Sequence, residues 1–553
     1  MLPRRTLALL SVPVLLSSQL FAAPARKAAP KRNLAQQIKA ILSQEPLARA
    51  YWGIHVVELE TGRVLFSQNA DQLFLPASNV KLFTTAAALS AAGPEYRFRT
   101  TVEAEGKIDS AGRLQGDLVI MGRGDPNISG RMLPYALKTE RAPPQTQLED
   151  MANQVAASGL KTVDGDLIGD DTFYAPERYG PGWAQDDVQW IDGAPVSALT
   201  FNDNVVFLNI QPGGQEGEKA LITLEPETNY YEIDNRVLTT AAGVTRKIGI
   251  HREAGSKKVV LWGSLPLADS GIKEALAIDD PAQFTAELFR VMLERRGIAV
   301  AGKTRARHGE IAHFFDLDLP SQSQGQQPQQ AVPGAPPEGA AKGASGARCC
   351  AQRIPAPPQA APSTVVLAEH ISLPLIEDVR VTNKTSQNLH AELALRLVSK
   401  LNGSGGSLEG GAATVKQFLL QAGLKEDEFV LLDGSGLSRR DLVTPVAVVR
   451  LLTYVARQPW GTAYEGALPV AAVDGSISER FVNSPAAGLI HAKTGTLSHV
   501  NALSGYGQTL RGRRFVFSIF CNNHNQPSAK VIAAIDSIVE LLVSDGGATK
   551  PFR

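Results

Sequence analysis

Three short groups of residues in this chain carry side chains suited to acyl transfer. Ser78 and Lys81 are three positions apart, so one helical turn brings the lysine amine to the serine hydroxyl. A desolvated lysine with a lowered pKa can accept the proton of a serine that attacks a carbonyl. Ser386 and Asn388 add a hydroxyl and an amide, and Lys493 begins a Lys-Thr-Gly-Thr run. These residue types predict a serine nucleophile and a covalent acyl-enzyme.

Each pattern by itself is common by chance. Ser158 and Lys161 have the same spacing as Ser78 and Lys81, and Ser67-Gln68-Asn69 repeats the Ser-x-Asn pattern. Order and context separate the pairs, because Ser158 lies among β-like sequence and Ser67 precedes the serine that it should follow. The three groups occur in the order characteristic of β-lactamases and penicillin-binding proteins.

The elements around these groups indicate one α/β (α+β) domain. Residues 52–59 and 63–66 form a hairpin pattern, and an Ala- and Leu-rich helix follows Ser78. Ser386 opens a helix with leucines at every fourth position, and Lys493 to Thr496 begins a strand. Further elements are the strands 502–506 and 515–521, joined by a turn at 511–513, and an amphipathic helix after Pro527.

More than half of the chain lies between Ser78 and Ser386, and its texture differs from the rest. Short β-like runs at 118–121, 205–210 and 259–262 alternate with Gly, Asp and Asn. The similar phrases that begin at Gly116 and Gly165 predict paired strands, and a helix is expected over 281–296. A β-rich excursion therefore interrupts the α/β domain.

The chain resembles the low-molecular-mass class C penicillin-binding proteins, the D-alanyl-D-alanine carboxypeptidase/endopeptidase family. The three motifs carry the resemblance together with phrases spread over most of the chain. These phrases are 122–126 (GRGDP), 195–204 (PVSALTFNDN), 381–384 (VTNK), 433–439 (DGSGLSR), 468–471 (LPVA), 474–475 (DG) and 492–506 (AKTGTLSHVNALSGY).

The resemblance implies a β-lactamase/transpeptidase-like serine acyl-enzyme domain with a β-rich two-domain insert. A signal peptide is expected at 1–25, and the catalytic domain is expected in two segments, 33–92 and 365–553. The insert between them is expected to comprise domain II, at 93–175 and 275–315, and a nested domain III at 176–274. A Gln/Pro/Ala-rich flexible segment is expected at 316–364.

The resemblance also implies a role for each motif residue. Ser78 is expected to attack the carbonyl of the penultimate D-Ala, with Lys81 as the base. Ser386 is expected to pass a proton to the leaving amine within a polar network that Lys493 holds. Asn388 is expected to bind the substrate amide. The expected contacts of the terminal carboxylate are Lys493, Thr494, Gly495 and Thr496.

Two further substrate contacts and two kinds of ligand follow from the resemblance. Asp171 in the insert is the acidic residue expected to meet the amine of a diamino acid, with a solvated turn as the alternative. Arg439 is expected to contact substrate or to be a surface charge. Peptidoglycan peptides are the expected substrates, and β-lactams are expected to acylate the same serine.

Bulk properties narrow the remaining possibilities. Residues 1–25 have the charged, apolar and small-residue order of a signal peptide, which predicts export to the periplasm, and no later run is long enough to span a membrane. The 55 basic and 55 acidic residues balance, so no nucleic-acid partner is expected. Three cysteines and nine scattered histidines show no metal-ligand spacing, and no cofactor or metal is expected.

Three alternatives stay open at this point. A β-lactamase of the commonest class needs a deacylating glutamate, and the one Glu-x-x-x-Asn phrase, at 479–483, lies just before Lys493 rather than soon after Ser386. A non-catalytic wall-binding scaffold and an esterase on the same fold are the others. The sequence leaves undecided carboxypeptidase against endopeptidase preference, oligomeric state, and the use of Cys349 and Cys350.

Overall fold

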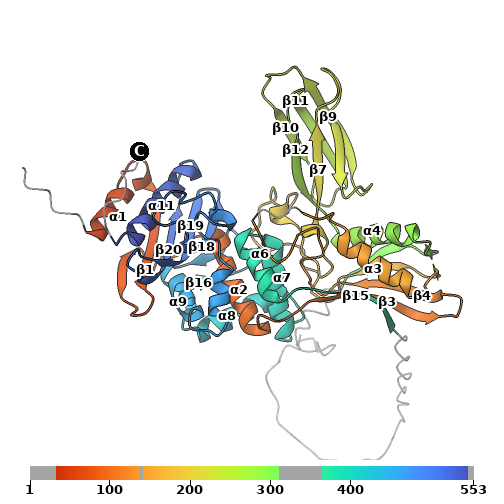
Figure 1. The fold of residues 1–553 in the computed structure, drawn as a ribbon, viewed down its shortest axis with the longest axis horizontal. Coiled ribbons are helices and arrows are strands. Elements are labelled where there is room, and N and C mark those ends of the chain that lie inside the picture. The colour runs from red at the N-terminus through yellow and green to blue at the C-terminus, as the bar shows by residue number, and fades with distance from the viewer. Residues whose placement is uncertain (1–32, 138–140, 311–363, 546–553) are drawn as a thin grey trace, which may run out of the picture.

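The computed structural model describes residues 33–137, 141–310 and 364–545. A sheet-and-helix part forms one end of the elongated molecule, and a β-rich part forms the other (Figure 1). The expected signal peptide at 1–25 and nearly all of the segment 316–364 lie outside the described residues. None of the described helices is long and apolar enough to cross a membrane.

The first part is built on an antiparallel sheet with strand order β18-β19-β20-β1-β2. Its strands are β1 (Tyr51–Glu58), β2 (Val64–Gln68), β18 (Ile490–Leu497), β19 (Val500–Gln508) and β20 (Arg514–Asn522). Strand β1, which lies between β20 and β2, is buried on both faces, so it is rich in apolar residues rather than alternating. The expected hairpin is confirmed by β1 and β2, and the expected strands 502–506 and 515–521 by β19 and β20.

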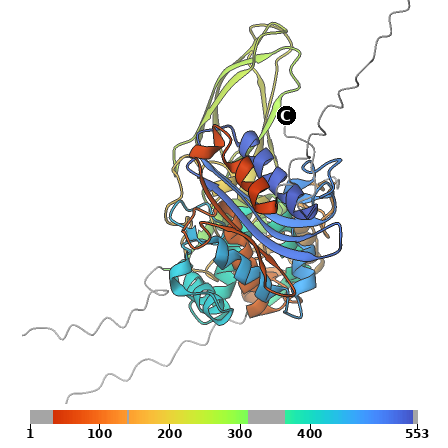
Figure 2. The same cartoon turned by 90° about the vertical axis from the view of Figure 1, so that its left-hand side faces the viewer.

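Helices cover both faces of this sheet. On one face, α1 (Leu34–Leu42) and α11 (Ser528–Val543) lie side by side across the strands (Figure 2). Ile38 and Ile535 belong to the same buried cluster as Ile54 and Val56 of β1. The apolar face that the sequence predicts after Pro527 is thus the face that α11 buries.

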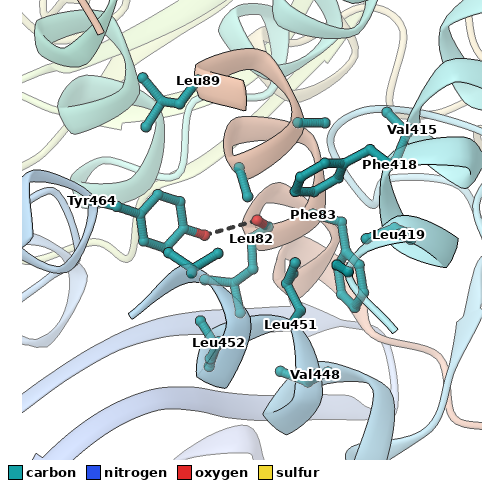
Figure 3. Packing of buried hydrophobic residues seen from close by; sticks show 14 of the residues in the cluster. Leu82, Phe83, Leu89, Val415, Phe418, Leu419, Val448, Leu451, Leu452 and Tyr464 are labelled. Atoms are coloured by element: carbon teal, nitrogen blue, oxygen red, sulfur yellow. Dashed lines mark hydrogen bonds between the residues drawn. The ribbon is translucent and has the colours of Figure 1, made fainter. Parts of the chain in front are cut away.

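The other face carries the helices that position the first two motifs, those of Ser78 and Ser386. They are α2 (Val80–Ala92), α6 (Leu375–Lys384), α7 (Asn388–Leu401), α8 (Leu408–Gln421), α9 (Pro445–Val455) and α10 (Gly461–Gly466), with the short strands β16 (Phe429–Val430) and β17 (Leu442–Val443). Figure 3 shows α2 surrounded by this layer, where Tyr464 Oη donates a hydrogen bond to Leu82 O at 2.8 Å. Because α2 is buried on nearly every side, its sequence is mostly apolar, and Lys81, Thr84 and Thr85 are its buried polar residues.

The β-rich part begins with a larger sheet. It comprises β3 (Arg99–Ile108), β4 (Arg113–Met121), β5 (Thr162–Val163), β6 (Leu167–Asp170), β13 (Ala299–Val300), β14 (Thr304–Arg307) and β15 (Thr364–Ile371), with helices α3 (Thr146–Ala157) and α4 (Pro281–Arg295). Leu118 pairs with Leu167 in parallel strands, which confirms the pairing expected from the two Gly-Asp phrases.

A smaller module extends from this sheet (Figure 1). Its two three-stranded sheets, β10-β11-β9 and β12-β7-β8, consist of β7 (Val205–Gln211), β8 (Leu221–Glu225), β9 (Glu232–Thr240), β10 (Lys247–His251), β11 (Lys258–Pro266) and β12 (Ile272–Ala277). The residues that flank the module at its two ends lie side by side, since Ile278 N donates to Asn204 O at 2.8 Å. It is therefore an excursion within the insert over residues 205–277, whereas the nested domain III is predicted over 176–274.

One segment belongs to a different part of the fold than expected. Residues 365–371 are expected in the catalytic domain, but β15 pairs with β3 in the sheet of the insert. The two chain connections between the parts meet beyond this strand, where Phe98 N donates to Ser372 Oγ at 2.9 Å. A strand pattern indicates that a segment forms a strand but does not indicate which sheet the strand joins. The predicted start of the second catalytic segment follows the change in composition near 364, and it therefore lies at the start of β15 instead of after its end.

Candidate active site

Ser78 lies at the entrance of the buried helix α2. It belongs to the 3-10 turn Ala77–Asn79 and is half-buried. Ala77 has a φ of 48°, a left-handed conformation that costs a non-glycine residue about 1–3 kcal/mol and persists only where the surroundings enforce it. Gly436 supplies part of those surroundings, since a Cβ there would lie 1.9 Å from Ala77 O. The strained turn aims Ser78 out of the helical layer.

Lys81 lies one turn further along and is completely buried. Its Nζ donates to Ser78 Oγ at 3.0 Å, Asn388 Oδ1 at 2.6 Å and Ser435 O at 2.7 Å. Burial lowers the pKa of Lys81 to about 8, although the carboxylates of Asp433, Glu392 and Asp192 oppose the shift. A neutral amine beside Ser78 is thus accessible near neutral pH, as a general base requires.

Ser386 and Asn388 come from the turn between α6 and α7. Ser386 has a φ of 61°, and Asn388 is the first residue of α7. Lys493 Nζ donates to Ser386 Oγ at 2.9 Å. Burial and the charge of Lys81 lower the pKa of Lys493 well below its usual value. Each serine therefore has a buried lysine within hydrogen-bond distance.

The insert contributes directly to this arrangement. Asn388 Nδ2 donates to the backbone carbonyl of Asp192 at 2.8 Å, while Asn388 Oδ1 accepts from Lys81. Asp192 belongs to the 3-10 turn Ile191–Gly193 of the insert. These two hydrogen bonds fix which way the Asn388 amide points.

Lys493, Thr494, Gly495 and Thr496 lie along β18, next to the turn that holds Ser78. Gly495 is needed for this approach, since a Cβ would lie 2.6 Å from Pro76 O. Asn79 Nδ2 also donates to Lys493 O at 3.3 Å. The structure thus brings together all three motifs that the sequence predicts, although they come from distant parts of the chain.

A cleft of about 420 Å³ opens onto these residues. Its lining comprises Ser78, Asp187, Asp192, Thr385, Ser386, Asn388, Gly436, Leu437, Arg439, Thr494, Thr496, Leu497 and Ser498. Lys81 and Lys493 lie behind this lining, completely buried. Within the described residues, no group of His, Cys, Asp and Glu is arranged to hold a metal ion.

The two further predicted contacts have different outcomes. Arg439 lines the cleft, but Asp171 does not. Asp171 Oδ2 accepts from Ser197 Oγ at 2.9 Å, and Asp171 Oδ1 lies 2.9 Å from His308 Nδ1. Asp171 follows β6 into the interior of the insert, so its carboxylate serves the packing of that part. The structure therefore does not bring Asp171 together with the residues that line the cleft.

Sequence reasoning missed the acidic residues that do line the cleft. Asp187 and Asp192 belong to a Gly-, Trp- and Asp-rich loop of the insert at 180–193. Burial raises the pKa of Asp187, and Arg439 opposes that shift. Consecutive aspartates between two tryptophans, Trp183 and Trp190, are a usable signal for a binding loop, although they do not reveal which part of the fold the loop faces.

Sequence reasoning also missed two carboxylates, those of Glu392 and Asp433, that hold the loop in contact with Lys81. Glu392 Oε1 accepts from the backbone N–H groups of Gly434 and Ser435, both at 2.9 Å. Asp433 accepts from Gly436 N at 2.7 Å. Burial and the charge of Asp433 raise the pKa of Glu392 to about 7. These carboxylates shape the loop whose Ser435 carbonyl holds Lys81.

The fold and this cleft define a serine peptidase of the β-lactamase/transpeptidase type. The model of the D-Ala-D-Ala carboxypeptidase 3 (S13) family matches residues 34–312 and 353–542. A D-alanyl-D-alanine carboxypeptidase from Actinomadura sp. (strain R39) is 34% identical over 562 residues, which cover 99% of this chain and 92% of the relative. The protein belongs to the D-Ala-D-Ala carboxypeptidase 3 (S13) family.

Solved structures agree on the fold. Penicillin binding protein 4 from Haemophilus influenzae superposes with a TM-score of 0.71 at 22% identity, covering 92% of this chain and 99% of that one. A structure of the same protein in complex with a β-lactam gives a TM-score of 0.65 at 21% identity, with the same coverage. The β-rich parts are included in this match, so they belong to the shared fold.

Proposed function

We propose that this protein is a D-Ala-D-Ala carboxypeptidase that acts on peptidoglycan stem peptides through an acyl-enzyme on Ser78. One observation carries the assignment of residues: two serines that line one cleft are each hydrogen-bonded to a buried lysine, at 3.0 Å for Ser78 and 2.9 Å for Ser386. Membership of the family supports the reaction. The signal-peptide pattern at 1–25 supports action in the periplasm.

In the proposed acylation, Ser78 Oγ attacks the carbonyl carbon of the penultimate D-Ala while neutral Lys81 accepts the hydroxyl proton. The tetrahedral intermediate collapses by breaking the C–N bond. Ser386 delivers a proton to the departing D-Ala amine and regains one through Lys493 Nζ. The products of this step are free D-Ala and an ester on Ser78.

Water then completes the reaction. A water molecule attacks the ester carbonyl and gives one proton, through Ser386, to Lys493, which lost a proton during acylation. The ester C–O bond breaks, protonated Lys81 returns a proton to Ser78 Oγ, and the shortened peptide leaves. If the departing amine belongs to a neighbouring peptide strand instead of free D-Ala, the same chemistry cuts a cross-link. We therefore include endopeptidase activity in the proposal, since both reactions use one acyl-enzyme.

The cleft supports recognition of a charged substrate. Thr494 and Thr496 line the cleft and offer hydroxyl donors for the terminal carboxylate, and Asn388 offers its amide to the substrate amide. Asp187 replaces Asp171 as the proposed contact for a side-chain amine, because its carboxylate belongs to the cleft lining.

β-Lactam labelling tests the nucleophile. The wild-type protein should be labelled by a fluorescent penicillin on the peptide that contains Ser78, and Ser78→Ala should lose the label. Ser158→Ala is the matched control, because Ser158 has the same spacing to a lysine but caps α3 in the insert. Label that survives in Ser78→Ala, or that maps elsewhere, would refute the assignment.

The same experiment separates the main alternatives. A peptidase of this kind should keep the penicilloyl label for many minutes, whereas a β-lactamase should release it rapidly. A non-catalytic scaffold should show no covalent label. Release of D-Ala from a peptide that ends in D-Ala-D-Ala distinguishes the peptidase from an esterase.

A further inference from the structure

The turn that carries Ser386 and Asn388 is braced by a buried histidine. His390 lies on α7, and its Nδ1 is 2.7 Å from Asp378 Oδ1 on α6, the helix on the other side of the turn. His390 has no exposed surface. The brace therefore closes the segment in which Ser386 adopts its left-handed backbone conformation.

The second ring nitrogen reaches the insert. His390 Nε2 lies 3.0 Å from Oδ1 of Asp203, a completely buried residue of the 3-10 turn Asn202–Asn204. Ionised carboxylates only accept hydrogen bonds, so both contacts are satisfied only when His390 carries both protons. The geometry thus requires an imidazolium between two carboxylates.

The surroundings compensate the buried charges. Asp203 Oδ2 accepts from Arg131 Nη2 at 2.5 Å and from Arg141 Nη2 at 3.4 Å. Asp378 Oδ1 also accepts from Asn127 Nδ2 at 3.1 Å. The charged and titratable groups that face His390 are Asp203, Asp378, Arg131, Arg141, Asp125 and, through Asp125, His370. Burial favours the neutral ring, but the two bonded carboxylates raise the pKa of His390 overall.

Helix geometry connects this cluster to the cleft. Asn388 and His390 are two positions apart, so their side chains leave nearly opposite sides of α7. Asn388 points to Lys81 and to the Asp192 carbonyl, while His390 points to Asp203 and Asp378. A small rotation of the first turn of α7 would break both sets of contacts together.

We propose that His390 is a positioning residue: its imidazolium joins α6, α7 and the insert, and so fixes Ser386 and Asn388 against Lys81. The proposal rests on the catalytic roles assigned above. It gives the insert a second task besides lining the cleft, since Asp203 of the insert supplies one of the two carboxylates.

Acylation kinetics test the role. In His390→Gln and in Asp203→Asn, the rate constant for acylation by a fluorescent penicillin should fall by roughly 10- to 100-fold, as for a misplaced catalytic group, while the dissociation constant of the initial complex changes little. Arg307→Gln is the control, because it removes a bidentate ion pair with Glu105 inside the insert. Its acylation rate constant should remain at the wild-type value.

A spectroscopic measurement keeps the test decisive if a variant does not fold. In wild-type protein labelled with ¹⁵N-histidine, the two ring nitrogens of His390 should report an imidazolium at neutral pH. In Asp203→Asn its pKa should fall. A neutral ring in the wild type, or unchanged acylation in folded variants, would overturn the proposal. Absence of any label on wild-type Ser78 would instead refute the proposed function.

Discussion

Lys81 combines two properties that favour opposite protonation states. Its Nζ donates to three oxygens, which the ammonium form does best, whereas burial lowers its pKa to about 8. Because the neutral amine is the form that accepts a proton, the neutral fraction and the acylation rate should rise together with pH.

We therefore expect the acylation rate constant to increase as pH rises through about 8 and then to level off. Arginine cannot be deprotonated in this range, so Lys81→Arg should lower the rate constant by about 10²- to 10⁴-fold, the usual contribution of a general base. Stopped-flow acylation across the pH range measures both. A flat profile for the wild type would argue against Lys81 as the base.

The acidic loop residue Asp187 makes a prediction about substrate charge. Asp187→Asn should lower kcat/KM by about 5- to 50-fold, a loss typical of one charge-assisted hydrogen bond, for a peptide with a free side-chain amine. A peptide with that amine acetylated should be cleaved equally by both proteins. Asp186→Asn is the matched control, since Asp186 is exposed and does not line the cleft. Equal losses for both peptides would exclude an amine contact.

Sequence patterns predicted the motif residues because each motif has a distinctive local context. Ser78 precedes an unusually apolar helix, and Lys493 lies in a strand whose glycine permits close approach. The choice of Asp171 and the omission of Asp187, which lines the cleft, have one cause. Both lie in loops of the insert, and only the folded chain determines which loop faces the cleft.

At the scale of elements, the loop from Asp433 to Asp441 is held rigidly against the nucleophile turn. Gly436 has a φ of 79°, and an added Cβ would meet the Ala77 carbonyl. Gly436→Ala should cost about 1–3 kcal/mol in backbone strain and displace Ser78, so acylation should slow more than stability falls. Thermal unfolding and penicillin labelling measure the two effects. Labelling of Gly436→Ala at the wild-type rate would show that the loop accommodates the added methyl group without moving Ser78.

His308 holds another set of elements together. It lies at the end of β14 between Asp171 and Asp280, the residue that caps α4, and hydrogen bonds to these carboxylates raise its pKa to about 10. A raised folded-state pKa stabilises the fold fully below the unfolded value near 6.5, and this contribution disappears as pH rises to about 10.

The wild type should therefore exceed His308→Gln in Tm most clearly below about pH 6.5, and the difference should vanish near pH 10. His251→Gln serves as the control, since His251 is exposed on β10. Differential scanning calorimetry at a series of pH values measures the difference in Tm between the wild type and each variant. A difference independent of pH would show that His308 acts through packing rather than charge.

For the whole molecule, polar contacts across the interface couple the cleft to the insert. Trp183 Nε1 donates to Asp433 Oδ2 at 2.9 Å, and Ser438 Oγ donates to Pro181 O at 2.7 Å, in addition to the contacts of Asn388 and His390. Loss of penicillin labelling in urea should coincide with the change in Trp183 fluorescence, read in a variant without the other tryptophans. Separate midpoints would show independent unfolding.

The overall architecture was predictable to the level of a catalytic domain with a nested β-rich insert, because composition and motif spacing change at the insert. The assignment of β15 was not, since its pairing with β3 joins residues from opposite sides of the excursion. Long-range strand partners are chosen by the assembled sheet rather than by local sequence.

The position of β1 between β2 and β20 has a consequence for the order in which the parts of the molecule can fold during synthesis. Tyr51 pairs with Asn522, so the second neighbour of β1 leaves the ribosome long after β1 itself. At roughly 5–20 residues per second, β1 waits on the order of 20–90 s for β20, whereas β3 can pair with β4 almost at once. The insert is thus expected to fold first during synthesis. Until β20 arrives, the apolar edge of β1 needs protection from aggregation.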